Sequence, residues 1–278
     1  MEVCVLSPLD LDKFEHLYPD SITTELPADA ILIGCIEESP LEAAGILMAH
    51  VEDSEILLDW IYVDEPHRRK GGGRAMLELL RDAAQEEGSS IAITAIFSQE
   101  DENVSPFLKA CNFMVTFREG DKGFSSLLKD FPKLKVVGDV PETFSILGDV
   151  PEAEINRFSQ KLGKRGVEGL AITLPFVASD YMDESGALLN EDGKIKGLCL
   201  MQKIPTGIRF TQIYNKTSTP GGLAFLINQC TDLLKEHYPP DTPFYFASVN
   251  SKIDEAIERF IPIQYSSEIY FGTYRFDL

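Results

Sequence analysis

An internal repeat constrains the fold of this 278-residue chain more than any other feature of its sequence. The segment GILMAHVEDSEILLDWIY, which starts at Gly45, aligns without a gap to GLCLMQKIPTGIRFTQIY, which starts at Gly197. Both segments begin with glycine, carry a polar turn in the middle and end in Ile-Tyr. Apolar runs on either side of a short polar turn are typical of a β-hairpin. We therefore expect two copies of one folding unit.

The segments that follow the two hairpins also match. Residues 70–73 (KGGG) lead into RAMLELLRDAAQEEG, and residues 220–222 (PGG) lead into LAFLINQCTDLLKEHYP. In the first of these, apolar residues recur at helical spacing and Gly88 ends the pattern. A short strand follows each helix, at residues 91–97 and 243–249, and a further helix follows each strand. Both copies predict the same order of hairpin, helix, strand and helix.

The repeat predicts two α/β domains, each with a mixed, mainly antiparallel sheet flanked by helices. A stretch rich in Pro, Gly and Lys, KDFPKLKVVGDVPET, separates the copies and indicates the boundary. We expect the first domain to span residues 1–137 and the second to span residues 138–278. The chain is long enough for two domains of about 140 residues each.

Composition and charge exclude several classes of protein. The net charge is −20, and a field of this sign repels nucleic acid and anionic membranes while attracting cations. No apolar run approaches the roughly 18 residues of a membrane span, and acids stand where a signal peptide carries lysines. The sequence predicts a cytoplasmic protein without nucleic-acid or membrane partners. Its five scattered cysteines and four unpaired histidines predict no metal site.

The segment WIYVDEPHRRKGGGRAMLELL carries the strongest chemical signal. An apolar strand ends at Val63, and basic residues and glycines lead directly into a helix. The first N–H groups of a helix lack intrahelical partners, and the helix dipole adds partial positive charge there. Glycines let the backbone approach a ligand, and cations neutralise its charge. The segment therefore predicts a pyrophosphate site formed by Arg68, Arg69, Lys70, Gly71, Gly72 and Gly73.

Two other phosphate-binding loops fit this segment less well. A dinucleotide-binding turn needs GxGxxG and an acid at the end of the next strand, but these glycines are contiguous and that strand ends in Phe97-Ser98-Gln99. A Walker loop needs GxxxxGK[ST], which the sequence lacks. His67, also in the loop, is expected to be solvated.

The same segment resembles the acetyl-CoA signature of the GNAT (N-acetyltransferase) superfamily, in which a strand ending in valine is followed by Arg-x-x-Gly-x-Gly and a helix. Arg68, Gly71 and Gly73 fill this pattern, and Val63 stands five residues before the arginine. The resemblance covers roughly residues 30–118. It implies a tandem GNAT protein with acetyl-CoA as co-substrate and a degenerate second copy.

The resemblance also implies the cofactor-binding residues. In the family, the strand before the loop separates from the next strand, and the pantetheine arm pairs with its backbone, here at Ile61 and Val63. A second motif of the family, further along the chain, contains an asparagine and corresponds here to DENVSPFLKACNF. Asn103 lies two residues from the position of that asparagine. Leu108 stands where the family often has the tyrosine that protonates the thiolate, so no general acid is assigned. The implied set is Ile61, Tyr62, Val63, Arg68, Arg69, Lys70, Gly71, Gly72, Gly73, Arg74 and Asn103.

An amine must lose a proton to attack a thioester, so a base is needed. Strand alternation is expected to place every second residue from Glu55 to Val63 on one face, Asp59 included. Trp60 would then point to the other face. By resemblance, Asp59 and Glu55 occupy positions where family members place active-site carboxylates. An acid inside the apolar strand ILLDWIYV is costly without a partner or a task, so Asp59 is the first candidate and Glu55 the second.

The second copy lacks these features. Alignment of the repeats places Gly207 opposite Glu55 and Thr211 opposite Asp59. The loop KTSTPGG is three residues shorter than its counterpart and has no arginine. The fold pattern is kept while the residues assigned to chemistry are lost, which predicts a degenerate domain.

The sequence thus predicts an N-acetyltransferase that moves an acetyl group from acetyl-CoA to an amine by direct attack. Small amines, aminoglycosides, amino acids and peptide N-termini all fit, and the net charge favours a cationic acceptor. The alternative is a non-catalytic acyl-CoA-binding sensor or scaffold. Both a monomer and a homodimer agree with the sequence.

Overall fold

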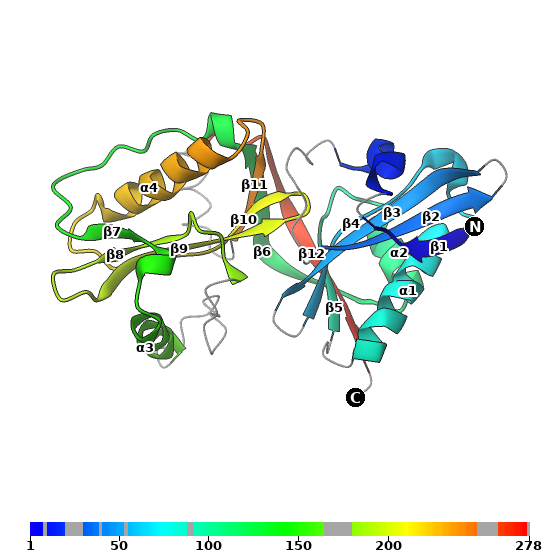
Figure 1. Ribbon diagram of the computed structural model, residues 1–278, viewed down its shortest axis with the longest axis horizontal. Helices are drawn as coiled ribbons and strands as arrows, with labels where there is room; N and C mark the ends of the chain where they lie inside the picture. The colour runs from blue at the N-terminus through cyan, green and yellow to red at the C-terminus, as the bar shows by residue number, and fades with distance from the viewer. Residues whose placement is uncertain are drawn as a thin grey trace. The chain divides into compact units, whose positions relative to one another are not determined.

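The computed structural model describes residues 1–7, 10–19, 30–38, 41–52, 55–87, 92–163, 180–248 and 261–276. The chain divides into two compact units. Unit 1 comprises Met1–Glu119, Ile204–Thr206 and Ser267–Leu278, and unit 2 comprises Gly120–Lys203 and Gly207–Ser266. Each unit is a sheet flanked by helices, as Figure 1 shows, which confirms the predicted α/β class.

The sheet of unit 1 has the strand order β1-β2-β3-β4-β5-β12. The first four strands are antiparallel neighbours, whereas β5 runs parallel to β4 and antiparallel to β12. The predicted first hairpin is therefore formed by β3 and β4. The strands are β1 (Glu2–Val5), β2 (Ile31–Glu38), β3 (Leu41–Glu52), β4 (Glu55–Val63), β5 (Ala92–Ser98) and β12 (Tyr265–Arg275).

The sheet of unit 2 has the order β7-β8-β9-β10-β11-β6. Here β11 runs parallel to β10 and antiparallel to β6, and β7, β8 and β9 are antiparallel neighbours. The strands are β6 (Met114–Leu127), β7 (Thr143–Ile146), β8 (Gly186–Leu189), β9 (Ile195–Ile204), β10 (Gly207–Asn215) and β11 (Pro243–Ser248).

The two sheets repeat one topology, as the sequence predicted. β4 and β10 both have 9 residues and start at Glu55 and Gly207, which the sequence alignment placed opposite each other. The helices α1 (Gly72–Glu87) and α4 (Gly222–His237) follow them and both have 16 residues. Each unit also has one parallel pair, β4 with β5 and β10 with β11.

In each unit the sixth strand comes from the other half of the sequence. β12, at the C-terminal end of the chain, pairs with β5 from Ile269 to Arg275. Residues 122–127 of β6 pair with β11 in unit 2. The units therefore do not follow a single division between residues 137 and 138. A strand pattern shows that a strand forms but not which neighbour it takes, so this exchange has no signature in the repeat.

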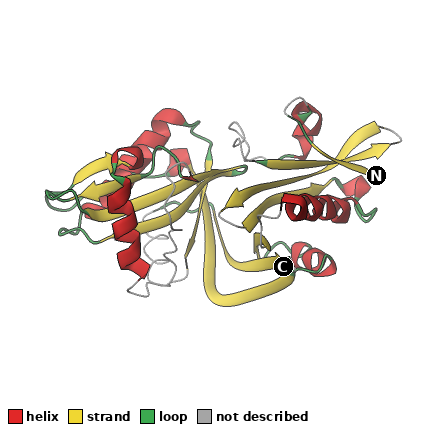
Figure 2. Cartoon of the chain, turned by 60° about the horizontal axis from the view of Figure 1, so that its bottom comes forward, coloured by secondary structure: helices red, strands yellow, loops and turns green. Residues whose placement is uncertain are grey.

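Helices cover both faces of the unit 1 sheet (red in Figure 2). On one face, α1 and α2 (Val104–Ala110) pack with the sheet around fully buried side chains such as Met76, Leu80 and Leu108. On the other, the short helix η1 (Leu11–Leu17) buries Phe14 and Leu17 against β2 and β3. We call these the α1 face and the η1 face. None of the helices in the described residues is long and apolar enough to span a bilayer.

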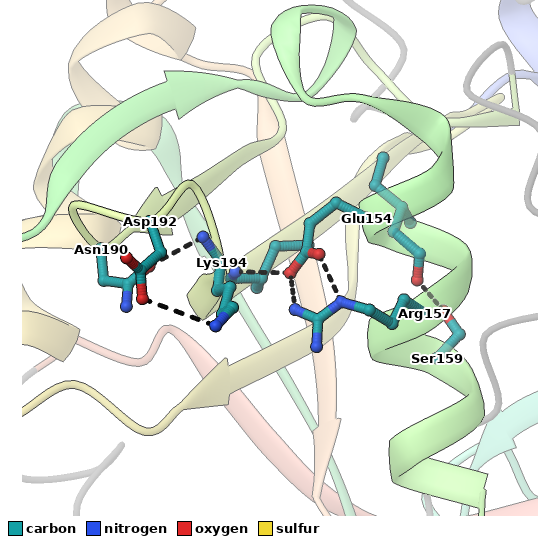
Figure 3. Close-up of polar contacts among 8 residues, drawn as sticks. Glu154, Arg157, Ser159, Asn190, Asp192 and Lys194 are labelled. Carbon is teal, nitrogen blue, oxygen red and sulfur yellow. Dashed lines mark hydrogen bonds and ion pairs between the residues drawn. The ribbon is translucent and has the colours of Figure 1, made fainter.

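In unit 2, the helix α3 (Glu152–Gly163) is fixed to the start of β9 through Glu154 (Figure 3). Its carboxylate accepts a hydrogen bond from the N–H of Ile195 at 3.0 Å and pairs with Arg157 one turn along the helix. Burial raises the pKa of Glu154, but these hydrogen bonds outweigh burial and hold the pKa below its ordinary value. Glu154 therefore acts as an ionised link between α3 and the sheet.

Candidate active site

β4 and β5 separate halfway along β4. Among the described residues, their parallel pairing ends at Leu58 and Ala95. Beyond this point β5 continues to pair with β12, and β4 continues to pair with β3 as far as Val63. The edge of β4 from Asp59 to Val63 is therefore not paired with β5. This opening, which we call the β4–β5 split, is lined by main-chain groups that a ligand can use.

The loop at the wide end of the split contains the predicted pyrophosphate residues. Arg69 and Gly71 have positive φ angles of 64° and 92°, and this left-handed turn lets α1 begin at Gly72. A Cβ added at Gly71 would meet no atom within 4 Å, whereas one at Gly72 would lie 2.7 Å from the Cys35 sulfur. Gly71 is therefore open to approach from outside, while Gly72 is small because the helix packs closely on β2.

Arg68 lies along the split. Its Nε donates a hydrogen bond to the carbonyl of Val63 at 2.8 Å, and its guanidinium carbon lies 5.4 Å from the centre of the Tyr62 ring. The Val63 carbonyl is one of the groups expected to contact pantetheine. The Arg68 side chain is exposed, so its guanidinium is also accessible to an anion.

Two other cations near the loop, Lys70 and Arg74, have partners within the protein. Lys70 Nζ lies 2.9 Å from Glu37 Oε2, and this hydrogen bond lowers the pKa of Glu37. Arg74 donates to the carbonyl of Ala110 at 3.1 Å. These contacts leave Arg68 and the exposed Arg69 as the cations best placed to meet a ligand.

The expectation that His67 is solvated is wrong. Only 7% of His67 is exposed, and its Nε2 lies 2.7 Å from Glu42 on β3. Its Nδ1 lies 3.5 Å from Glu37, the partner of Lys70. The short helix η2 (Glu65–His67) turns the ring back onto the sheet, a conformation that the loop sequence does not reveal. His67 therefore anchors the loop to β2 and β3.

A β-bulge at Asp59 changes the facing of β4. Trp60 lies opposite Met48 and Leu58 lies opposite Ala49, so Asp59 has no position of its own on β3. Leu58 and Ile61 both pack on the α1 face, although strict alternation would separate them. The expectation that Glu55, Asp59, Ile61 and Val63 share one face is therefore wrong, because alternation shifts by one residue at the bulge.

The bulge directs Asp59 toward the η1 face, where the side chain of His50 lies. On β3, His50 follows Met48 by two residues and shares its face. The Asp59 Oδ2 and His50 Nδ1 atoms are 2.6 Å apart, and the two side chains are only 7% and 6% exposed. Trp60 also packs on this face, so it does not point away from Asp59 as alternation predicted. No local pattern in the sequence singles out His50, because its contact with Asp59 depends on the bulge.

The second candidate base, Glu55, lies at the start of β4, before the split. Its Oε2 accepts a hydrogen bond from Thr94 Oγ1 on β5 at 2.8 Å. Leu108 is fully buried in the core of the α1 face, so this position supplies no hydroxyl group. Asn103 precedes α2 but its side chain makes no capping hydrogen bond.

The counterpart loop in unit 2 is filled by the protein itself. The Glu142 carboxylate accepts hydrogen bonds from the backbone N–H and the hydroxyl of Ser218, both at 3.0 Å. A Cβ at Gly221 would lie 2.5 Å from the carbonyl oxygen of Val137, so residues 131–142 pass directly over the loop. The Asn228 side chain holds this segment through two 2.8 Å hydrogen bonds with the Leu134 backbone. In this copy a carboxylate of the protein itself is bonded to the loop.

This arrangement predicts a pH-dependent contribution of Glu142 to stability. Burial raises its pKa, but the Ser218 hydrogen bonds and the charge of Lys196 outweigh burial and lower it. The stabilisation is present above the ordinary glutamate pKa of about 4.3 and is lost as the pH falls through the lowered value. Glu142→Gln should therefore lower the melting temperature at pH 7, and the difference should shrink as the pH falls below the ordinary glutamate pKa. Calorimetric melts across this range, with the exposed Glu191→Gln as control, test the expectation; a pH-independent difference would contradict it.

Comparisons with known proteins agree with this geometry. Residues 6–113 match the model of the acetyltransferase (GNAT) family, whose members are in general acyltransferases that use acyl-CoA. The chain is similar in structure to a tandem GNAT protein from the clavulanic acid biosynthesis pathway, with a TM-score of 0.60 and 15% identity over 99% of this chain and 98% of that one. It is also similar to a GCN5-related N-acetyltransferase from Sphaerobacter thermophilus, with a TM-score of 0.57 and 12% identity over 100% and 96%.

No curated protein sequence matches the chain. At 12–15% identity, the structural likeness establishes the fold, while the family model covers the part of the chain that contains the split and its loop. The chain thus matches the acetyltransferase (GNAT) family over residues 6–113, and over its whole length it has the fold of a tandem GNAT protein.

Proposed function

We propose that this protein is an N-acetyltransferase that moves an acetyl group from acetyl-CoA to an amine by direct attack. The observation that carries the proposal is the β4–β5 split, which has an anion-binding loop at one end and the His50–Asp59 pair at the other. Acetyl-CoA fits such a site, because its pyrophosphate would bind at the loop and its acyl-pantetheine arm would extend along the split toward the pair.

The residues of the loop and of β4 fit acetyl-CoA. Gly71 is open to the outside, and α1 begins directly after it, so unpaired N–H groups face the loop. Arg68 and Arg69 would neutralise the pyrophosphate, and the β4 backbone at Ile61 and Val63 would pair with the pantetheine amides. When bound, acetyl-CoA supplies the activated acyl group.

The remaining chemistry falls to side chains at the narrow end of the split. Asp59 with His50 offers a buried proton-accepting pair there, whereas Glu55 is held by Thr94 before the split begins. A non-catalytic acyl-CoA sensor would need the loop but not a buried acid–base pair beside the split, so the pair favours an enzyme. The charge of −20 favours a cationic acceptor.

Release of free thiol from acetyl-CoA tests the activity directly. The full-length protein would be incubated with acetyl-CoA and, separately, spermidine, tobramycin, lysine and a peptide with a free N-terminus. We expect thiol release above the no-acceptor rate, with an acetylated product of matching mass, for at least one of them. Binding of CoA without release for any acceptor would favour the sensor.

Gly71→Asp should weaken CoA binding at least about tenfold. The substitution places a negative charge where the backbone would meet phosphate, and a tenfold loss corresponds to about 1.4 kcal/mol. Gly193→Asp is the matched control, because Gly193 also has a positive φ of 71° and empty space around its Cβ position, but lies in a turn of unit 2. Equal affinities of the two variants in calorimetry would remove the loop from the binding site.

We also expect one CoA per chain. In unit 2, Glu142 and the segment at Val137 cover the corresponding loop, and an additional anion there would meet a buried carboxylate. Calorimetric titration of the full chain measures the stoichiometry. A second, equivalent site would show that unit 2 opens to ligand and that its loop is not degenerate.

A further inference from the structure

The ring of His50 is buried on the η1 face of the sheet, and the described residues use only one of its two nitrogens. His50 is 4% exposed, and its Nδ1 faces the Asp59 carboxylate at 2.6 Å. Its Nε2 is fully covered and has no hydrogen-bond partner among the residues that the structure describes. Buried polar atoms without partners are rare in folded proteins and often mark a group with a chemical task.

Asp59 determines which nitrogen of His50 holds the proton. An ionised carboxylate only accepts hydrogen bonds, so Nδ1 must donate to it. In the neutral imidazole the lone pair then lies at Nε2, which makes this atom a proton acceptor. Asp59 therefore fixes the tautomer in which Nε2 can act as a base.

The pair lies where the acyl group is expected. Asp59 is the first residue of β4 beyond the last β4–β5 pair, at the narrow end of the split. Val63, next to the loop, is four residues further along, or about 13 Å at 3.3 Å per residue of strand. Among the described residues, Cys4, Tyr18 and Tyr62 also pack on the η1 face, and η1 itself carries Asp12, Lys13, Glu15 and His16. Glu55, at the start of β4, is bonded to Thr94.

We propose that Nε2 of His50, and not the carboxylate of Asp59, accepts the proton of the attacking amine, and that Asp59 is a positioning residue. This inference rests on the proposed acetyl transfer. The amine lone pair forms the C–N bond while the C–S bond breaks and its electrons pass to sulfur. The proton lost by the amine moves to Nε2 and then to the thiolate, which leaves neutral His50 and free thiol. Because His50 returns the proton to the thiolate, the reaction needs no separate acid at the position that Leu108 occupies.

The first test reads the tautomer of His50 without relying on activity. Nitrogen-15 NMR of the full chain, labelled in histidine and assigned with the His50→Asn variant, distinguishes a protonated Nδ1 from a protonated Nε2. We expect the Nδ1–H form, with no proton on Nε2. Asp59→Asn should shift the ring toward the Nε2–H form, because an amide can donate to Nδ1. An Nε2–H tautomer in the unsubstituted protein would overturn the proposal.

The second test measures turnover. His50→Asn keeps an N–H donor near Asp59 but removes Nε2, so thiol release should fall about 10²- to 10⁴-fold while CoA affinity changes less than about twofold. His237→Asn is the matched control, because His237 also bonds a carboxylate, Glu184, at 2.7 Å but lies in unit 2. Activity of His50→Asn within tenfold of the unsubstituted protein would overturn the proposal.

The two tests separate failure of this inference from failure of the proposed function. If the unsubstituted protein acetylates none of the test amines, N-acetyl transfer to them is refuted, while the NMR result still decides whether Nε2 is the free acceptor. If His50→Asn does not fold, shown by its melting curve, Asp59→Asn takes its place in the turnover assay, since loss of the tautomer should lower turnover by at least tenfold.

Discussion

A chain that ends after residue 137 is expected to lose its cooperative fold and its CoA binding. It lacks β12, the sixth strand of the unit 1 sheet, which pairs with β5 from Ile269 to Arg275. Without β12, the apolar strand β5 becomes an unprotected edge, which promotes association between chains. Phe276 is also lost from the core, and Arg81 of α1 loses the Tyr274 ring on which it stacks at 3.9 Å.

The size of the loss follows from the buried groups. Removing one large buried side chain from a core costs about 2–5 kcal/mol, and whole domains are stable by only about 5–15 kcal/mol. Ile269 and Phe276 are 5% and 8% exposed, and the strand's backbone hydrogen bonds are lost with them. A fragment without β12 should therefore show no cooperative thermal transition and should bind no CoA in calorimetry.

A chain of residues 1–119 joined by a flexible Gly-Ser linker to residues 264–278 is the matched control. It restores β12 to β5 and omits nearly all of unit 2. We expect this protein to melt cooperatively and to bind CoA. If instead the fragment 1–137 melted and bound CoA like the full chain, the pairing of β12 with β5 would not be needed for the fold of unit 1.

Asp59→Asn is expected to reduce turnover about 10²- to 10⁴-fold with CoA affinity nearly unchanged. The substitution keeps the shape of the side chain but removes the charge that holds Nδ1 of His50 in its protonated form. Asp59 lies at the narrow end of the split and away from the loop, so the nucleotide contacts should persist. Steady-state thiol release and calorimetry with CoA measure the two effects separately.

Glu55→Gln is the informative comparison, because Glu55 is the second candidate base on the same strand. Its carboxylate accepts from Thr94, and an amide oxygen can accept the same hydrogen bond. We expect this variant to lose less than about tenfold in turnover. If Asp59→Asn retained near-normal turnover while the turnover of Glu55→Gln fell about 100-fold, the base would be Glu55 and the role given to Asp59 would be wrong.

The sequence by itself determined the two hairpins, the helices that follow them and the loop, whereas the helix predicted at residues 251–260 lies outside the described residues. Spacing of apolar residues and the position of glycines are local properties, so they predict β3, β4 and α1 and their copies β9, β10 and α4. The nine-residue strands that begin at Glu55 and Gly207 match the ungapped alignment of the repeat. The phosphate-type loop before α1 follows from the same local reasoning, because a helix N-terminus has the same free N–H groups in any fold.

The tertiary structure alone decided which strands are neighbours and how the candidate active site is arranged. β5 takes β12 as its neighbour across more than half of the sequence, and a strand pattern does not specify a partner at that distance. The bulge at Asp59 depends on the pairing of β4 with β3 and brings the carboxylate to His50. Glu142 reaches the loop of unit 2 because the connecting segment packs along α4. Such contacts depend on the packing of residues far apart in sequence, and so local patterns do not encode them.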